Sequence, residues 1–455
     1  MIHKLIISLV RIVANTFFRR IDVVGFENIP QDGPVIFAGN HPNALMDGWL
    51  LIAKCGRWPL HFLGDAKLWE YRMLRPMLDA CGAIPVYRRE EHGPEVDNSK
   101  AFEKVYQVIE SGQSIGIFPE GVSHVESQLV RLKTGTARIA LSVAARGKVK
   151  VSIVPCGLNY IHRHRFRSQV LIEFGPPVVI DDKWLRDYAR DEQGTVRQLT
   201  DHLANALKGV TLNAPDWRTL RFIQTARRLY KPSSVELSPG QYVELSRRFV
   251  SRYLAMMDDP ALLAFRDRVE DYQSHLELLG LKDYQLRSAI TPGYAIRKIV
   301  GRMLMMIALL PLAIPGALVH LPVGWIAATV GEKFSYEKDD VATLKVLATI
   351  LLLPLIYVGI AVAVGISFGA GWAVVVMVAL AFSFIASVRL IEAEVSLLMS
   401  ILSLLRIARL GKEVEELRAT RAALVNEVRT LADRHADPTL PRMFTSKDFA
   451  TRDNR

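Results

Sequence analysis

Residues 35–50 read VIFAGNHPNALMDGWL, and the rest of the chain can be arranged around this stretch. Its first four residues form a short apolar run typical of a buried strand, and Gly39 and Asn40 favour a turn. Asn43 is a residue type that caps helices, so we expect a helix to begin there and to continue past Leu50. The stretch therefore predicts a strand, a tight turn and a helix.

The predicted turn sets a histidine and an aspartate close together. On one continuous helix, His41 and Asp47 would point about 240° apart. The two side chains can therefore pair only if His41 lies in the turn and folds back over the first helical turn. Pro42 favours this arrangement, because it holds His41 in an extended backbone. An aspartate that accepts from one imidazole nitrogen leaves the other free to take a proton from a hydroxyl group. The alternative is an ordinary surface histidine.

Composition narrows the class of protein. The chain has 455 residues, of which half are apolar, and a formal net charge of +11. It is long enough for two or three structural units, and it is more apolar than an ordinary soluble enzyme. The charge favours an anionic partner, which could be nucleic acid, lipid headgroups or a phosphate-rich substrate. The three cysteines show no metal-ligand spacing, which argues against a zinc site or a disulfide framework and fits a reducing, cytoplasm-facing compartment.

Residues 1–20 predict an amphipathic helix. Polar side chains recur at helical spacing along an apolar body, at Lys4, Ser8, Arg11, Asn15 and Arg19. Arg11 interrupts the apolar run that a secretory signal would keep. The helix is expected either to lie in a membrane interface or to pack on the protein's own core.

Residues 21–180 alternate short apolar strands with helical stretches, which predicts an α/β domain with a mixed sheet covered by helices. We expect this domain to be the catalytic one. Within it, residues 81–89 (CGAIPVYRR) predict a strand ending at Arg88, whose guanidinium group can bind a phosphate through two hydrogen bonds. A solvated strand-end arginine is the alternative.

Two further stretches carry polar groups at the ends of predicted elements. Residues 114–124 (SIGIFPEGVSH) run from a strand into a turn with Glu120 and Gly121 at its tip, where glycine lets the backbone approach a ligand. Residues 132–141 (LKTGTARIAL) open a helix whose N-terminus, together with Lys133, could receive an anion. A last strand follows at residues 149–156 and ends in the turn PCGLNY, expected to line the site.

In this order, the four stretches resemble the motif blocks of the glycerolipid acyltransferases, the lysophosphatidate and glycerol-3-phosphate acyltransferases. The resemblance covers about 120 residues. It implies transfer of a fatty acyl group from a thioester, either acyl-coenzyme A or acyl-carrier protein, with no cofactor, no metal and no acyl-enzyme intermediate. The implied roles are His41 as general base, Asp47 as its orienting partner, Arg88 and Lys133 at the substrate phosphate, and Glu120 and Gly121 at the acceptor pocket.

The sequence departs from the common family pattern in two places. Five residues separate His41 from Asp47, where the family commonly has four, and Val122-Ser123 replaces the Thr-Arg that often follows Phe-Pro-Glu-Gly. The spacing and the motifs GAIPVYR and FPEGVSH resemble the branch of the yeast-type glycerol-3-phosphate/dihydroxyacetone-phosphate acyltransferases and their bacterial relatives. The phosphate contact of the missing arginine would have to come from Lys133, Arg131 or Arg138.

The second half of the chain predicts helices and membrane segments. Residues 181–300 form a helical region with segments at 184–208, 217–230, 241–257 and 262–279. Residues 301–390 form a transmembrane region with candidate spans at 304–330, 344–366 and 372–388. Prolines interrupt the first candidate, so we expect two full spans plus a re-entrant or interfacial segment, with three plain spans as the alternative. Residues 391–455 are expected to form a helical tail with a disordered end.

The leading interpretation is an integral membrane acyltransferase of phospholipid biosynthesis, with glycerol-3-phosphate as acceptor and the catalytic domain facing the cytoplasm. Lysophosphatidate is the alternative acceptor. A non-catalytic membrane scaffold that binds lipid is the alternative of another class. A nucleic-acid partner lacks the interleaved aromatic and basic pattern that such proteins show. The C-terminal helix could form a homo-oligomeric coiled coil or pack on the catalytic domain.

Overall fold

The computed structural model describes residues 2–70, 72, 75–87, 93, 97–232, 235–287, 292–335, 339–434, 442–444 and 448. The chain divides into two compact units. Unit 1 comprises Met1–Leu220, Leu237–Arg247 and Ser335–Thr343, and unit 2 comprises Arg221–Glu236, Arg248–Phe334 and Leu344–Arg455.

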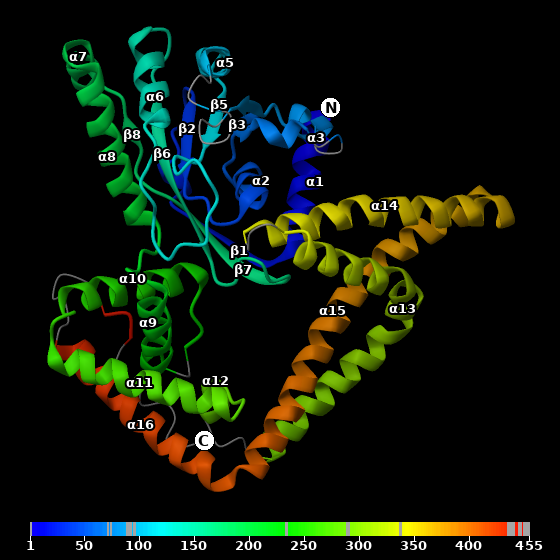
Figure 1. Cartoon of the computed structure of the whole chain (residues 1–455). Helices are drawn as coiled ribbons and strands as arrows, with labels where there is room; N and C mark the ends of the chain where they lie inside the picture. Colours follow the sequence, from blue (N-terminus) through cyan, green and yellow to red (C-terminus); the bar gives the residue numbers. More distant parts are fainter. Residues whose placement is uncertain are drawn as a thin grey trace. The chain divides into compact units, whose positions relative to one another are not determined.

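Unit 1 is built on a mixed sheet, which in the described part of the chain has eight strands (Figure 1). The strand order is β1-β7-β6-β2-β5-β3-β4, and β8 pairs with β6. Among the described strands, only the pairs that β6 forms with β7 and β8 are antiparallel. The predicted α/β class with a mixed sheet is therefore confirmed. The strands are β1 (Phe18–Val24), β2 (Val35–Gly39), β3 (Leu60–Asp65), β4 (Ile84–Val86), β5 (Ser114–Ile117), β6 (Ser152–Tyr160), β7 (Ser168–Phe174) and β8 (Val178–Val179).

Helices cover both faces of the sheet (Figure 1). On one face, α5, α6 and α8 bury an aliphatic core that includes Ile36 and Ala38 of β2. The residue between them, Phe37, points to the opposite face, as strand alternation requires, and packs edge-on against Phe174 at a centroid distance of 6.0 Å. The α-helices of this unit are α1 (Ile2–Phe17), α2 (Ala44–Lys54), α3 (Arg75–Ala80), α5 (Ser99–Glu110), α6 (Gly135–Ala145), α7 (Asp182–Arg190) and α8 (Glu192–Val210), with short 3-10 helices η1 (Phe26–Asn28) and η2 (Ala66–Trp69).

Helix α1 has one face on the protein and one in solvent. Val10, Ala14 and Phe17 are buried, while Leu9 and Ile12 are 49% and 63% exposed. The sequence left open whether this helix packs on the core or lies in a membrane interface. It packs on the core and still presents an apolar edge.

The register of the central strands brings three chain segments to one edge of the sheet. β2 lies between β5 and β6 and is parallel to both, with Ala38 opposite Ile117 and Gly39 opposite Cys156. The carboxyl ends of parallel strands lie at the same edge, which is where α/β proteins place their sites. The turns that follow β2 and β5 therefore meet the end of β6.

Unit 2 is helical. Two helices of the second half begin with proline, Pro239 of α10 and Pro260 of α11, where a missing N–H costs nothing. α16 packs on α11 and α12 of the same unit, and its Arg421 Nε donates to Asp283 Oδ1 at 2.9 Å. The helices are α9 (Trp217–Tyr230), α10 (Pro239–Ala255), α11 (Pro260–Leu278), α12 (Asp283–Leu286), α13 (Pro292–Lys333), α14 (Asp340–Phe368), α15 (Ala370–Arg409) and α16 (Gly411–Arg434), of which α9, α10 and α14 begin in unit 1.

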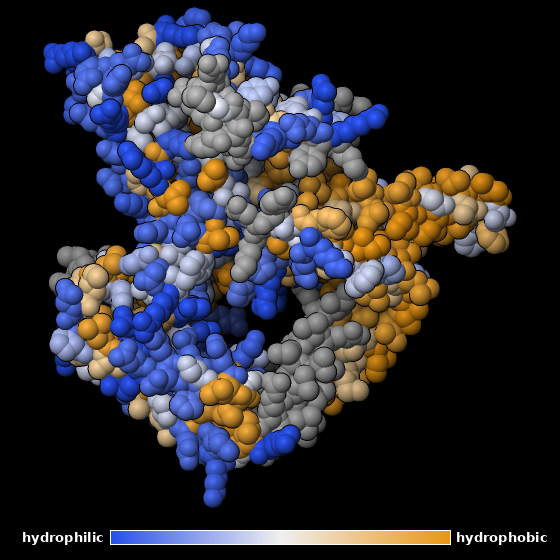
Figure 2. All heavy atoms as spheres, viewed as in Figure 1, coloured by the Kyte–Doolittle hydropathy of each residue, from blue (hydrophilic) through white to orange (hydrophobic). Residues whose placement is uncertain are grey.

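Three helices among the described residues are long and apolar enough to cross a membrane: Ile299–Lys333, Asp340–Phe368 and Ala370–Leu390. Figure 2 shows the apolar surface that covers α14. The expected interruption of the first segment is wrong, because α13 continues as one helix through Pro311, Pro315 and Pro322. Its buried His320 bonds the hydroxyl group of Tyr357 on α14 at 2.7 Å, so α14 holds α13 two residues before Pro322.

Candidate active site

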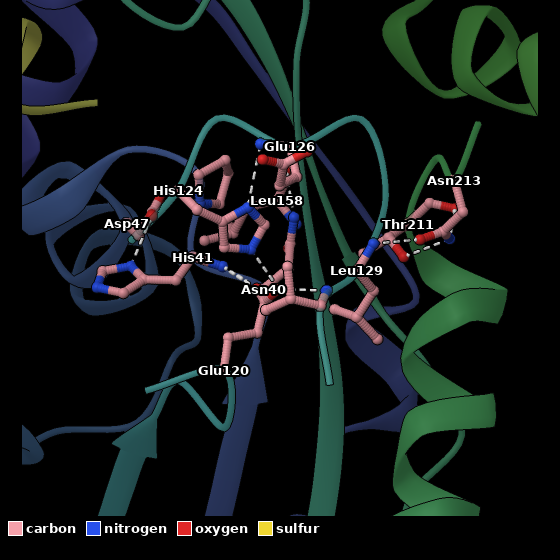
Figure 3. Close-up of polar contacts among 12 residues, drawn as sticks. Asn40, His41, Asp47, Glu120, His124, Glu126, Leu129, Leu158, Thr211 and Asn213 are labelled. Carbon is pink, nitrogen blue, oxygen red and sulfur yellow. Dashed lines mark hydrogen bonds and ion pairs between the residues drawn. The ribbon is translucent and has the colours of Figure 1, made fainter. Parts of the chain in front are cut away.

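His41 and Asp47 meet at the turn between β2 and α2. His41 precedes the helix, and its ring folds back so that Nδ1 lies 2.9 Å from Asp47 Oδ2 (Figure 3). The side chain of Asp47 is fully buried and that of His41 is 17% exposed. A carboxylate can only accept here, so the ring proton is on Nδ1 and the lone pair is on Nε2. In the described part of the chain, Nε2 has no hydrogen-bond partner, and the ring is therefore set up to accept a proton.

Asp47 is held by two further donors. The backbone N–H of Asn43 donates to Oδ2 at 2.7 Å, and the hydroxyl group of Tyr160 donates to Oδ1. Burial raises the pKa of Asp47, and its hydrogen bonds to His41, Tyr160 and Asn43 oppose that shift. The expected side-chain cap by Asn43 is wrong: Asn43 lies at the cap position, but its side-chain amide donates to the carbonyl of Arg163 at 3.1 Å.

Glu120 braces the backbone of His41. Its carboxylate is buried, with Oε1 accepting from the His41 N–H at 2.8 Å and Oε2 from the Val130 N–H at 3.0 Å. The ring of His124 also donates to Oε2 (Figure 3). Phe118, at the end of β5, stacks flat on the His41 ring at 4.0 Å between centroids. The β5 turn therefore fixes both the backbone and the ring plane of His41.

Two residues that the sequence did not single out as site residues close the arrangement. The His124 N–H donates to the His41 carbonyl at 3.1 Å. Arg163, in the loop after β6, donates through one nitrogen to the carbonyls of Pro42 and His124, at 3.2 and 3.1 Å. Its guanidinium group thus joins the β2 turn to the β5 turn. The signal available in the sequence was the basic run IHRHRFR at residues 161–167.

The predicted phosphate-binding residues are only partly described. Gly121 has a φ of +79°, and a Cβ there would lie 2.8 Å from Lys133 Cδ, so the lysine stem crosses over this glycine. The Lys133 N–H donates to the Pro119 carbonyl at 2.7 Å, which joins the start of α6 to the β5 turn. Lys133, Arg131 and Arg138 are exposed. Arg88 lies outside the described residues.

Two family models match this chain. Residues 20–159, which hold the whole His41 turn and the Glu120 turn, match the family model described as Acyltransferase. Residues 222–440 match the model described as Glycerol-3-phosphate acyltransferase 2 C-terminal domain. The predicted resemblance to the glycerolipid acyltransferases and to the yeast-type branch is therefore confirmed.

Individual relatives agree with this assignment. The chain is similar to glycerol-3-phosphate O-acyltransferase 2 of Saccharomyces cerevisiae, with 32% identity over 79% of this chain and 53% of the relative. It is also similar to glycerol-3-phosphate O-acyltransferase 1 of the same yeast, with 30% identity over 64% of this chain and 40% of the relative. The chain thus spans about half the length of these relatives. Among solved structures, it is similar to the 1-acyl-sn-glycerophosphate acyltransferase PlsC of Thermotoga maritima, with 18% identity and a TM-score of 0.30 over 44% of this chain and 80% of that chain.

Proposed function

We propose that this chain is a membrane-bound O-acyltransferase that transfers a fatty acyl group from an acyl thioester to a hydroxyl group of glycerol-3-phosphate. The observation that carries the proposal is the His41–Asp47 pair, with Nδ1 bonded to a buried carboxylate and Nε2 unbonded within the described residues. Two relatives named glycerol-3-phosphate O-acyltransferases, and a matched domain described in the same terms, support this acceptor.

In the proposed reaction, His41 Nε2 takes the proton of the acceptor hydroxyl group as its oxygen attacks the thioester carbonyl. The new C–O bond forms, the C–S bond breaks, and the leaving thiolate recovers the proton from the imidazolium. Asp47 stabilises the imidazolium and keeps the ring in one tautomer. A positioned base of this kind contributes about 10²- to 10⁴-fold to the rate.

The acceptor phosphate needs a cationic anchor, because holding both substrates in register can contribute up to about 7–11 kcal/mol. We propose Arg88 and Lys133 for this role, with Gly121 giving close approach to the backbone. Lys133 lies over Gly121 and is exposed, which supports its part of the proposal. For Glu120, the buried contacts to His41 and His124 favour a bracing role at the acceptor pocket over a direct bond to substrate.

The alternative acceptor is lysophosphatidate, which would use the same base and the same anchor. The match of residues 222–440 to the glycerol-3-phosphate acyltransferase C-terminal domain favours glycerol-3-phosphate. A non-catalytic lipid-binding scaffold is the alternative of another class. The complete set of hydrogen bonds around Asp47 and Glu120 favours catalysis, because a scaffold has no need of a buried carboxylate beside a histidine.

We further propose that long apolar helices of the second half, α14 and α15 among them, span the membrane and that unit 1 faces the cytoplasm. The three long apolar helices support membrane insertion. The exposed Leu9 and Ile12 on α1 support an additional contact of this helix with the bilayer interface.

The proposal is tested by acyl transfer with purified full-length protein in detergent. A labelled acyl-coenzyme A is offered with glycerol-3-phosphate or with lysophosphatidate. We expect acylated product from glycerol-3-phosphate. Product from lysophosphatidate alone would replace the acceptor, and no product with coenzyme A or carrier-protein thioesters would favour the scaffold.

A further inference from the structure

Among the described side chains that form a hydrogen bond with His41 or Asp47, Tyr160 is the most distant in sequence. It lies at the carboxyl end of β6, 113 residues after Asp47, and its hydroxyl group donates to Asp47 Oδ1. The other oxygen, Oδ2, accepts from His41 and from the Asn43 N–H. Among the described residues, the Tyr160 hydroxyl group is therefore the donor to Asp47 Oδ1, the oxygen that His41 does not contact.

The phenol is built to stay a donor. Its ring packs against Phe18 at 5.7 Å between centroids, and burial together with the neighbouring Asp47 raises the pKa of Tyr160 well above its ordinary value. It therefore keeps its proton at neutral pH. The charged form of the Asp47 carboxylate is therefore stabilised by the O–H group of Tyr160.

We infer that Tyr160 is a positioning residue that sets the proton affinity of the His41–Asp47 pair. The inference rests on the proposed acyl transfer for its catalytic meaning. A hydrogen bond to a carboxylate stabilises its charged form, so the pair takes up a proton less readily than it would without the phenol. The same bond prevents Asp47 from rotating, which keeps Oδ2 on His41 Nδ1.

The groups that face this pair come from several elements. They are His41 and Asp47 themselves, Arg163 from the loop after β6, and Asp339 from the segment Ser335–Thr343, which acts on Arg163. Glu120 and His124 face the backbone of His41. A Tyr160→Phe substitution removes none of these groups, so we assign a change in proton affinity to the lost hydroxyl group.

The test compares Tyr160→Phe with the wild type in the pH dependence of kcat. Phenylalanine keeps the ring against Phe18 and removes only the O–H group. Loss of a hydrogen bond to a charged group predicts a fall in kcat of about 10- to 100-fold, with KM for the acceptor little changed. The acidic limb of the profile should move to higher pH, because the pair binds a proton more readily. A matched control is Tyr188→Phe, whose hydroxyl group bonds Ser142 and Glu192 and should leave kcat and the profile unchanged.

A second readout does not depend on turnover. The measurement is ¹³C NMR of protein labelled at histidine Cε1 and tyrosine Cζ, with chemical shifts followed against pH. The midpoint of the His41 Cε1 shift should lie at higher pH in Tyr160→Phe than in the wild type. In the wild type, the Tyr160 Cζ shift should change with the same midpoint as His41. An unchanged midpoint in the variant, or a Tyr160 signal indifferent to the His41 titration, would overturn the inference. If the His41 midpoint moves as expected but the wild type transfers no acyl group, the proposed function is wrong and the inference on Tyr160 is still supported.

Discussion

Two buried carboxylates hold His41, one at its ring and the other at its backbone. Asp47 accepts from the ring, and Glu120 accepts from the backbone N–H of the same residue at 2.8 Å. A carboxylate can accept several bonds at once, whereas an amide offers a single acceptor oxygen. The choice of glutamate and aspartate at these positions therefore has a physical reason that does not depend on direct contact with substrate.

Glu120→Gln should lower kcat while leaving the protein folded. The two Glu120 oxygens serve three donors, from His41, His124 and Val130. Glutamine would set its NH₂ group against at least one of them, which costs about 1–3 kcal/mol in the free energy of unfolding and loosens the His41 backbone. Urea unfolding and kcat measure the two effects. Glu126→Gln, at an exposed position of the same loop, is the matched control, and equal losses in both variants would contradict the bracing role.

His124 should make stability depend on pH. Burial lowers the pKa of His124, but its hydrogen bond and charge pairing with Glu120 outweigh burial, and the net direction is upward from 6.5. A histidine whose pKa is raised by folding stabilises the fold most below its unfolded pKa, and this contribution is lost as pH rises through the raised value. Protonation at Nδ1 costs the bond from the Glu126 N–H, at 3.2 Å, which limits the size of the effect.

The measurement is the melting temperature of the wild type and of His124→Gln as a function of pH. The gap between them should be larger at about pH 5.5 than at about pH 9. A gap that is constant, or that widens with rising pH, would contradict the assignment.

The pairing of His41 with Asp47 could be predicted from the sequence, because both residues lie in one turn and the proline restricts the backbone. Tyr160 and Arg163 could not be predicted as partners of that turn, since they come more than a hundred residues later and reach it only through strand pairing of β6 with β2. Local spacing carries no information on such contacts. Arg88 stays a prediction.

Strand β6 is the element on which the site depends, and α8 is packed very closely against it. A Cβ on Gly157 would lie 1.9 Å from the Val210 carbonyl oxygen, and the side chain of Asn159 donates to that same oxygen at 2.9 Å. The end of α8 thus fixes the part of β6 that leads to Tyr160. The sequence predicted a strand at residues 149–156 that ends in a turn at PCGLNY, and the turn is wrong, because β6 continues as a strand to Tyr160. The sequence also could not show which helix covers this strand.

Gly157→Ala should destabilise unit 1 through this contact. The added methyl group cannot fit without moving backbone, which costs about 1–3 kcal/mol or more in the free energy of unfolding. Gly209→Ala is a suitable comparison, because no atom lies within 4 Å of the added Cβ and alanine favours the helix. In thermal unfolding, the melting temperature should fall for Gly157→Ala and rise slightly for Gly209→Ala. Equal stability of both would show that β6 and α8 are not packed as described.

Two helices of the second half begin at a proline, α10 at Pro239 and α11 at Pro260. The same residue type misled the interpretation of α13, where three prolines lie inside one continuous helix. Proline removes an intrahelical bond wherever it stands, and the sequence does not show whether a neighbouring helix compensates for the loss. The C-terminal helix α16 packs on α11 and α12 in its own unit, and the proposed coiled coil has no support from this packing.

At the scale of the whole molecule, the long apolar helices are concentrated in the second half of the chain. Three helices satisfy the length and composition of membrane spans, with mean hydropathy from 2.1 to 2.6. The number of crossings and the side on which unit 1 lies remain proposals. Two matched domains account for most of the chain, with residues 20–159 in unit 1 and residues 222–440 mostly in unit 2.

The full-length protein should stay with the membrane after an alkaline carbonate wash, which strips peripheral proteins and leaves spanning helices in place. The physical reason is the apolar length of α14 and α15, which cannot return to water without exposing their surfaces. Fractionation followed by immunoblotting measures the distribution. Recovery of the protein in the soluble fraction would mean that the apolar helices do not span the bilayer.

The most direct test of the account is kcat for acyl transfer to glycerol-3-phosphate by His41→Ala, measured beside the wild type. We predict a fall of about 10²- to 10⁴-fold, because the general base is lost. His275→Ala, at an exposed histidine of unit 2, is the matched control, and melting curves establish that the variants are folded. A folded His41→Ala enzyme that keeps most of the wild-type kcat would contradict the claim that His41 is the base.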